Sequence, residues 1–283
     1  MPSNCKMTSV LEDNFFSLLR SGVLGHRSVI QPMSEWKWHR LCHVAQCHGI
    51  SSWMLKGYQL MREDFFLQQH SNAFTSLSVI ADNELNQSHL NDDTQVIDYS
   101  ERIYKMSTPF LNKRYEGIVN QAQQNNDTVN LFKLIVHNSK CLLNTGVNLH
   151  LLIQLVLCLS QEKKIVADQL DNYLKETRLA GMAQYLGELI ISLFSVDAGS
   201  VVFMKKKSIQ HKRMIEEDLH DIFIKRPNDW FFTQSNHVFV KASDTHAMYQ
   251  QFGKTMKYFF FAPVESFTNL TSAITHSLAH IEE

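Results

Sequence analysis

The chain has 283 residues, of which 44% are apolar and 19% are charged; this balance is typical of a globular protein and excludes a disordered chain or a coiled coil. Lys and Arg number 27 against 28 Asp and Glu, so no broad basic field attracts a nucleic-acid backbone. The cysteines are sparse and odd in number, 5 in all, which indicates reduced thiols rather than a disulfide framework.

The chain shows no signal for secretion or for membrane insertion. Its first residues contain no apolar stretch of the kind found in signal peptides, and no later run approaches the ~20 apolar residues of a membrane span. Residues 149–159 are the most apolar segment, but Gln154 interrupts it, and a buried helix is predicted there. We therefore expect a cytoplasmic protein without a membrane partner.

Short amphipathic helices are predicted in the first part of the chain. Apolar residues recur at helical spacing in residues 10–22 and 35–49, each of which ends at a glycine, and a further helix covers 51–63. Ser34 is a suitable N-cap for the second of these helices. Residues 65–87 are predicted as one more amphipathic helix.

A strand is predicted at 94–106, where β-branched and aromatic residues partly alternate with polar ones. Pro109 suits the first turn of a helix over 109–124. The pattern is then helical from 128 to 194, in segments of the length and spacing of a helical bundle with short connections. The predicted segments are 128–144, 147–161, 166–179 and 180–194.

The last part of the chain begins with a charged helix predicted over 205–226. A hairpin over 227–243 and two closing helices over 246–261 and 263–281 follow. The predicted fold class is therefore mainly α (α+β): a helical bundle with a small residual β-sheet around 94–106 and 229–240.

A metal site is one interpretation of the helix at 35–49. His39 and His43 are four residues apart on one helix face, and Cys42, Cys47 and His48 are close in sequence, a spacing that can hold zinc or another transition metal. The glutamate of the zinc-protease motif is absent, and no second ligand pair occurs at a recognised spacing. A partly exposed helix with two histidines is the alternative.

Carboxylates near the predicted strand suggest phosphoryl-transfer chemistry, because two-metal sites use clustered aspartates. Asp92 and Asp93 precede the strand and Asp98 lies in it, although Asp92 and Asp93 are also ordinary turn residues. The basic run Lys205–Lys207 is soon balanced by Glu216, Glu217 and Asp218, which is typical of a solvated helix. Motifs for a nucleophilic serine, a P-loop and a dinucleotide-binding turn are absent.

Several segments resemble an uncharacterised bacterial nucleotidyltransferase family, whose members join helical segments to a polymerase-β-like palm. The segments follow one another in the same order as in that family. In the opening segments, a Leu-Leu-Arg-x-Gly helix precedes a Trp-containing helix. Near the end, 256–270 is similar to a Phe-x-x-x-Pro-x-Glu segment. The similar segments are 14–25, 35–61, 96–118, 129–159, 212–223 and 256–270.

The chain departs from that family where the family's chemistry lies. Active members carry a phosphate-binding turn and a Gly-Asp-Ile-Asp motif between the opening helices and the third strand; here this interval shrinks to about 70–93 and holds no Asp-x-Asp pair. Asp98 falls where the family has a carboxylate, and Arg102 where it has an arginine. A single carboxylate cannot hold two Mg²⁺ ions. In the family's Gly-Ile-Gly-Leu-Arg motif, Asn148 replaces the second glycine and His150 the arginine.

The resemblance implies a division into an N-terminal helical segment (1–64), a truncated remnant of the nucleotidyltransferase core (65–125) and a C-terminal helical domain (126–283). Its leading functional implication is a catalytically inactive scaffold or protein-binding module that needs no cofactor and binds a protein rather than nucleic acid.

Two alternatives remain open. The first is an active, Mg²⁺-dependent nucleotidyltransferase that moves a nucleoside monophosphate from an NTP to a small molecule or a protein. It would use Asp98 with Asp92 or Asp93 as metal ligands and Arg102 for nucleotide binding. The second is a helical metal-binding protein that uses His39, His43 and Cys47.

Overall fold

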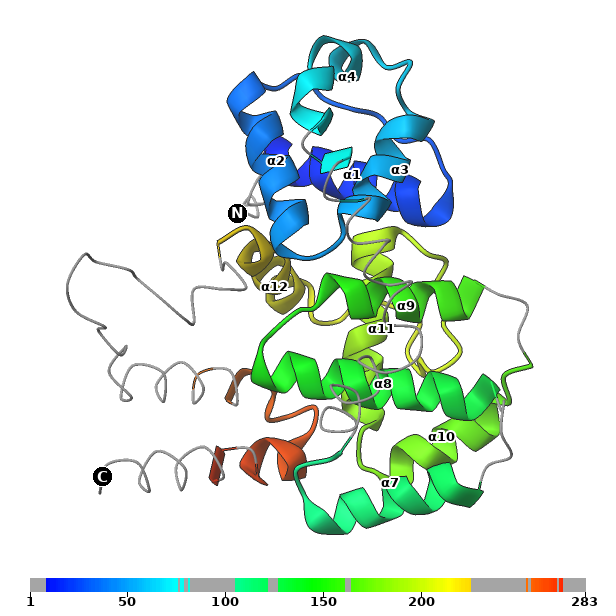
Figure 1. Ribbon diagram of the computed structural model, residues 1–283. Helices are drawn as coiled ribbons and strands as arrows, with labels where there is room; N and C mark the ends of the chain where they lie inside the picture. The colour runs from blue at the N-terminus through cyan, green and yellow to red at the C-terminus, as the bar shows by residue number, and fades with distance from the viewer. Residues whose placement is uncertain are drawn as a thin grey trace, which may run out of the picture. The chain divides into compact units, whose positions relative to one another are not determined.

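The computed structural model describes residues 9–75, 77–78, 81, 105–121, 127–160, 164–224, 253, 256–268 and 270–271 (Figure 1). Regular secondary structure within these residues is entirely helical, which confirms the prediction of a mainly helical protein. The described residues divide into two compact units. The first contains the residues up to 81 with 193–195 and 219–224; the second contains 105–192, 196–218 and 253–271.

The first unit begins with four helices: α1 (Val10–Leu24), α2 (Glu35–Cys47), α3 (Ser51–Leu60) and α4 (Phe65–Gln69). Ser9 and Glu12 form a capping box at the start of α1, because each side chain accepts a hydrogen bond from the other's backbone N–H. Ser34 occupies the N-cap position of α2 as predicted, but its side chain makes no capping hydrogen bond.

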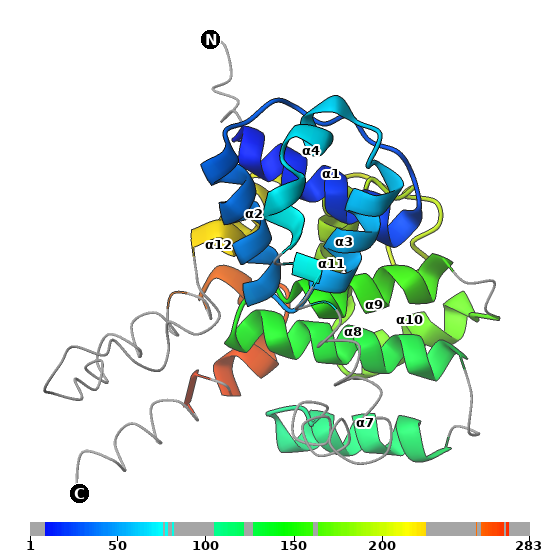
Figure 2. The same cartoon turned by 45° about the horizontal axis from the view of Figure 1, so that its top comes forward.

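Two glycines allow α1 and α3 to approach until their backbones touch (Figure 2). A Cβ atom added to Gly57 would lie 2.1 Å from the carbonyl oxygen of Leu18, and one added to Gly22 would lie 1.9 Å from that of Trp53. Both distances are far inside van der Waals contact. Glycine is therefore required at both positions.

The second unit is built from α7 (Pro109–Gln121), α8 (Asp127–Asn144), α9 (Leu149–Ser160), α10 (Ala167–Glu176), most of α11 (Ala180–Phe194) and the first half of α12 (Lys212–Ile224), whose residues from 219 on belong to the first unit. Figure 1 shows α8 and α9 side by side and antiparallel. The turn between them contains Gly146 with a φ of 99°, which a side chain rarely tolerates. The helices predicted over 128–194 are thus confirmed.

Some predicted boundaries differ from the structure. The predicted helix 65–87 is interrupted at His70, after which 71–75 form a further helical turn. The charged helix predicted over 205–226 begins only at Lys212, so that prediction was wrong for residues 205–211, which form an irregular loop.

The predicted β-sheet is not seen in the described chain, because 94–104 and 229–240 lie outside the described residues. Residues 82–104 of the predicted core remnant lie outside them too, so the three-part division stays a prediction. In the part of the chain that the structure describes, no helix is both long and apolar enough to cross a membrane.

Candidate functional site

A buried carboxylate, Asp218 on α12, is the centre of a polar cluster in the second unit. Asp218 is only 3% exposed. Its Oδ2 accepts a hydrogen bond from the hydroxyl of Tyr185 on α11 at 2.5 Å, and its Oδ1 accepts one from Lys257 Nζ at 2.5 Å. The hydroxyl of Tyr258 lies 2.7 Å from both carboxylate oxygens. Asp218 therefore ties α11 and the segment around residue 258 to α12.

The environment of Tyr185 keeps its hydroxyl protonated. Burial raises the pKa of Tyr185, and the neighbouring carboxylate of Asp218 raises it further. The neutral hydroxyl then donates to Asp218 at any physiological pH. Tyr185 is therefore the donor in this hydrogen bond.

A second carboxylate, Glu188 on α11, is fully buried at 0% exposed. Its Oε2 accepts hydrogen bonds from the backbone N–H groups of Gln210 and His211, both at 3.0 Å, and contacts His211 Nδ1 at 2.9 Å. Gln184 Nε2 donates to Oε1 at 3.1 Å. Burial alone would raise the pKa of Glu188, but these hydrogen bonds outweigh it and lower that pKa.

A third buried carboxylate, Glu265, lies at the N-terminus of α7. It is 3% exposed and accepts hydrogen bonds from the backbone N–H groups of Ser107 and of Thr108, the latter at 3.1 Å. The hydroxyls of Thr108 and Thr268 are 2.9 Å apart beside it. Glu265 thus accepts hydrogen bonds from backbone N–H groups at a helix N-terminus that would otherwise lack a partner within the helix. The helix dipole also favours a negative charge there.

These buried carboxylates share one chemical property, which is that protein donors occupy their oxygens. Hard cations such as Mg²⁺ bind carboxylate oxygens that remain open to the ion. Asp218, Glu188 and Glu265 hold backbone and side-chain donors instead, so their arrangement stabilises the helical core.

Asn148 and His150, which the resemblance aligns with a glycine-rich motif, have local structural partners. Asn148 Oδ1 accepts from the backbone N–H of Leu151 at 3.1 Å and caps α9. His150 Nε2 lies 3.0 Å from Gln154 Nε2 on the exposed face of α9. A small hollow adjoins the turn. It is lined by Asn138, Leu142, Gly146, Val147, Asn148, Leu152, Leu186 and Leu189.

The candidate nucleotidyltransferase residues Asp92, Asp93, Asp98 and Arg102 lie outside the described residues. Their roles therefore stay predictions.

The candidate metal ligands of α2 fall into separate pairs. His43 Nε2 lies 3.6 Å from Cys47 Sγ, whereas His39 Nε2 lies 3.8 Å from Glu35 Oε1. His48 Nε2 contacts the carbonyl oxygen of Ile222 at 3.0 Å. Among the described residues, no group of three or more His, Cys, Asp or Glu side chains is placed to hold one ion.

Cys42, the other thiol of this helix, is buried, and burial raises its pKa to about 12. The thiol of Cys42 is therefore shielded from solvent, unlike the exposed side chains of His39 and His43 on the same helix.

By sequence alone, Asp218 is only one of the acidic residues that balance the basic run, and its burial is not predicted. A usable signal was present, because Asp218 is three residues after Ile215 and four before Ile222, both buried on the apolar face of α12. His211, four residues after the basic run, contacts Glu188.

Comparisons with known proteins identify no family model, no curated protein and no solved structure that matches this chain.

Proposed function

We propose that this protein is a catalytically inactive relative of the nucleotidyltransferase family that acts as a helical scaffold and binds another protein. The observation that carries the proposal is that Asp218 and Glu265 accept hydrogen bonds from groups of the protein itself. Both lie in segments that resemble the family, and both hold protein donors rather than an open ligand position. Helical packing is thus the property that these segments retain.

The altered glycine-rich motif supports the same proposal. Asn148 and His150 engage neighbours on α9, and the adjoining hollow is small. A motif that positions phosphate needs backbone N–H groups and a cation facing the ligand. Here the N–H of Leu151 is already taken by Asn148.

Protein binding is supported by large apolar side chains exposed to solvent. Phe260 is 89% exposed and Phe267 is 60% exposed, and both belong to the described segment 256–268. Aromatic side chains are enriched at the centres of protein interfaces, where their burial contributes most of the binding energy. A partner that covers these rings would remove this apolar surface from water.

Gentle purification of the tagged chain from its native cells tests the scaffold role. We expect a protein partner in stoichiometric amount with the wild type, strongly reduced by Phe260→Ser. Phe65→Ser is the matched control, because Phe65 is also an exposed aromatic residue, at 63%, but belongs to the first unit. Recovery of the chain alone, or equal recovery of the partner with both variants, would contradict this role for Phe260.

A further inference from the structure

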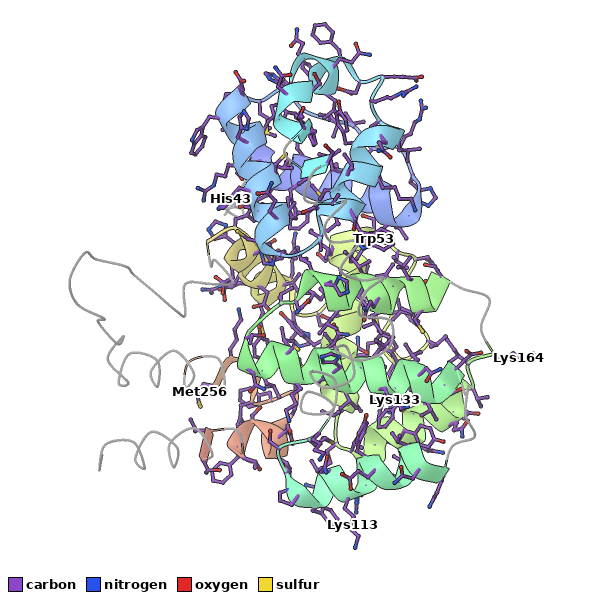
Figure 3. All side chains as sticks on the ribbon, viewed as in Figure 1. His43, Trp53, Lys113, Lys133, Lys164 and Met256 are labelled. Carbon is purple, nitrogen blue, oxygen red and sulfur yellow. The ribbon has the colours of Figure 1, made fainter. Side chains whose placement is uncertain are left out.

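One face of α2 carries metal-binding side chains at every turn. Glu35, His39, His43 and Cys47 are spaced four residues apart, which places them in a row along the helix. His43 is exposed and Cys47 is partly exposed, so solvent ions reach both; Figure 3 labels His43 at the outer side of α2. The whole row belongs to the first unit.

Within this row, the distance between His43 and Cys47 matches a tetrahedral metal site. Zinc binds imidazole nitrogen at about 2.0 Å and thiolate sulfur at about 2.3 Å, so two such ligands at a tetrahedral angle lie about 3.5 Å apart. His43 Nε2 and Cys47 Sγ are 3.6 Å apart. This side-chain hydrogen bond therefore already holds the two ligand atoms close to the separation that the ion needs.

We propose that His43 and Cys47 form a two-ligand site for a zinc-class divalent ion, with water in the remaining coordination positions. Binding forms one metal–nitrogen and one metal–sulfur bond and releases the thiol proton of Cys47 to solvent. His39 is outside this site, because its Nε2 lies beside Glu35, one helical turn closer to the N-terminus.

The chemistry of the pair selects the kind of ion. Imidazole and thiolate are soft or borderline ligands that favour zinc, cobalt, nickel and copper, whereas Mg²⁺ prefers oxygen ligands. The site is therefore independent of the Mg²⁺ chemistry of a nucleotidyltransferase. Its presence or absence leaves the proposed scaffold role unaffected.

Titration of the reduced full-length protein with Co²⁺, followed by absorbance, tests the site, because thiolate–cobalt bonds give a charge-transfer band. We expect the wild type to show this band and Zn²⁺ to abolish it by displacement. Cys47→Ser should remove the band. His43→Ala should weaken Co²⁺ binding by more than the roughly tenfold that loss of a second-shell partner costs.

His39→Ala is the matched control, because it removes an exposed histidine from the same helix face and should leave Co²⁺ affinity unchanged. Circular dichroism of each variant verifies that the helix remains folded. An absent band, or a band that persists in Cys47→Ser, would overturn the proposal. An equal loss in His39→Ala and His43→Ala would also overturn it.

Discussion

Replacement of Gly57 by alanine is expected to lower the free energy of unfolding by about 1–3 kcal/mol or more. The added Cβ would lie 2.1 Å from the carbonyl oxygen of Leu18 and 3.1 Å from the backbone nitrogen of Gly22. Backbone atoms cannot rotate away as a side chain can, so α1 and α3 would have to separate. Denaturant unfolding followed by circular dichroism measures the change.

Gly117→Ala is the control for Gly57→Ala. Gly117 lies inside α7, and no atom lies within 4 Å of the position of its missing Cβ. Alanine there should stabilise the protein by up to about 1 kcal/mol, because alanine is the better helix former. Equal effects of the two substitutions would show that α1 and α3 do not require close backbone contact.

Removal of the buried carboxylate in Asp218→Ala is expected to cost about 3–5 kcal/mol, the usual effect of breaking a buried charge pair. Lys257 would lose its partner at 2.5 Å, and the hydroxyls of Tyr185 and Tyr258 would lose their shared acceptor. Chemical denaturation of the purified variant measures this loss, and near-ultraviolet circular dichroism reports the changed tyrosine environment.

Glu217→Ala separates burial from charge as the cause of that loss. Glu217 precedes Asp218 on α12 but its side chain is 47% exposed, with Arg213 Nε at 3.2 Å and Lys257 Nζ at 3.9 Å. Exposed ion pairs contribute about 0–1 kcal/mol, so we expect a small effect. If Glu217→Ala were as destabilising as Asp218→Ala, the buried cluster would not be the source of stability.

The helices of this protein were predictable where apolar periodicity is strong and the termini are marked. The prediction for 180–194 agrees with α11 at both ends, because apolar residues recur throughout that segment. The prediction for 205–211 failed, because the backbone N–H groups of Gln210 and His211 bind Glu188 from another helix. A tertiary contact of that kind has no local signature in sequence.

The candidate site was less predictable than the fold. The run Glu216, Glu217, Asp218 has the local composition of a solvated helix, and only its register relative to Ile215 marks Asp218 as buried. The need for glycine at position 57 depends on the approach of Leu18, which is distant in sequence. The spacing of His43 and Cys47 was visible, but their separation from the Glu35–His39 pair required coordinates.

The central claim, that the chain retains a helical scaffold without nucleotide chemistry, is tested most directly by calorimetric titration with ATP, GTP, CTP and UTP, with and without Mg²⁺ or Mn²⁺. We predict no metal-dependent nucleotide binding by the wild type and none by Asp98→Ala. Metal-dependent binding at micromolar strength that disappears in Asp98→Ala would contradict the claim and would favour the alternative of an active nucleotidyltransferase.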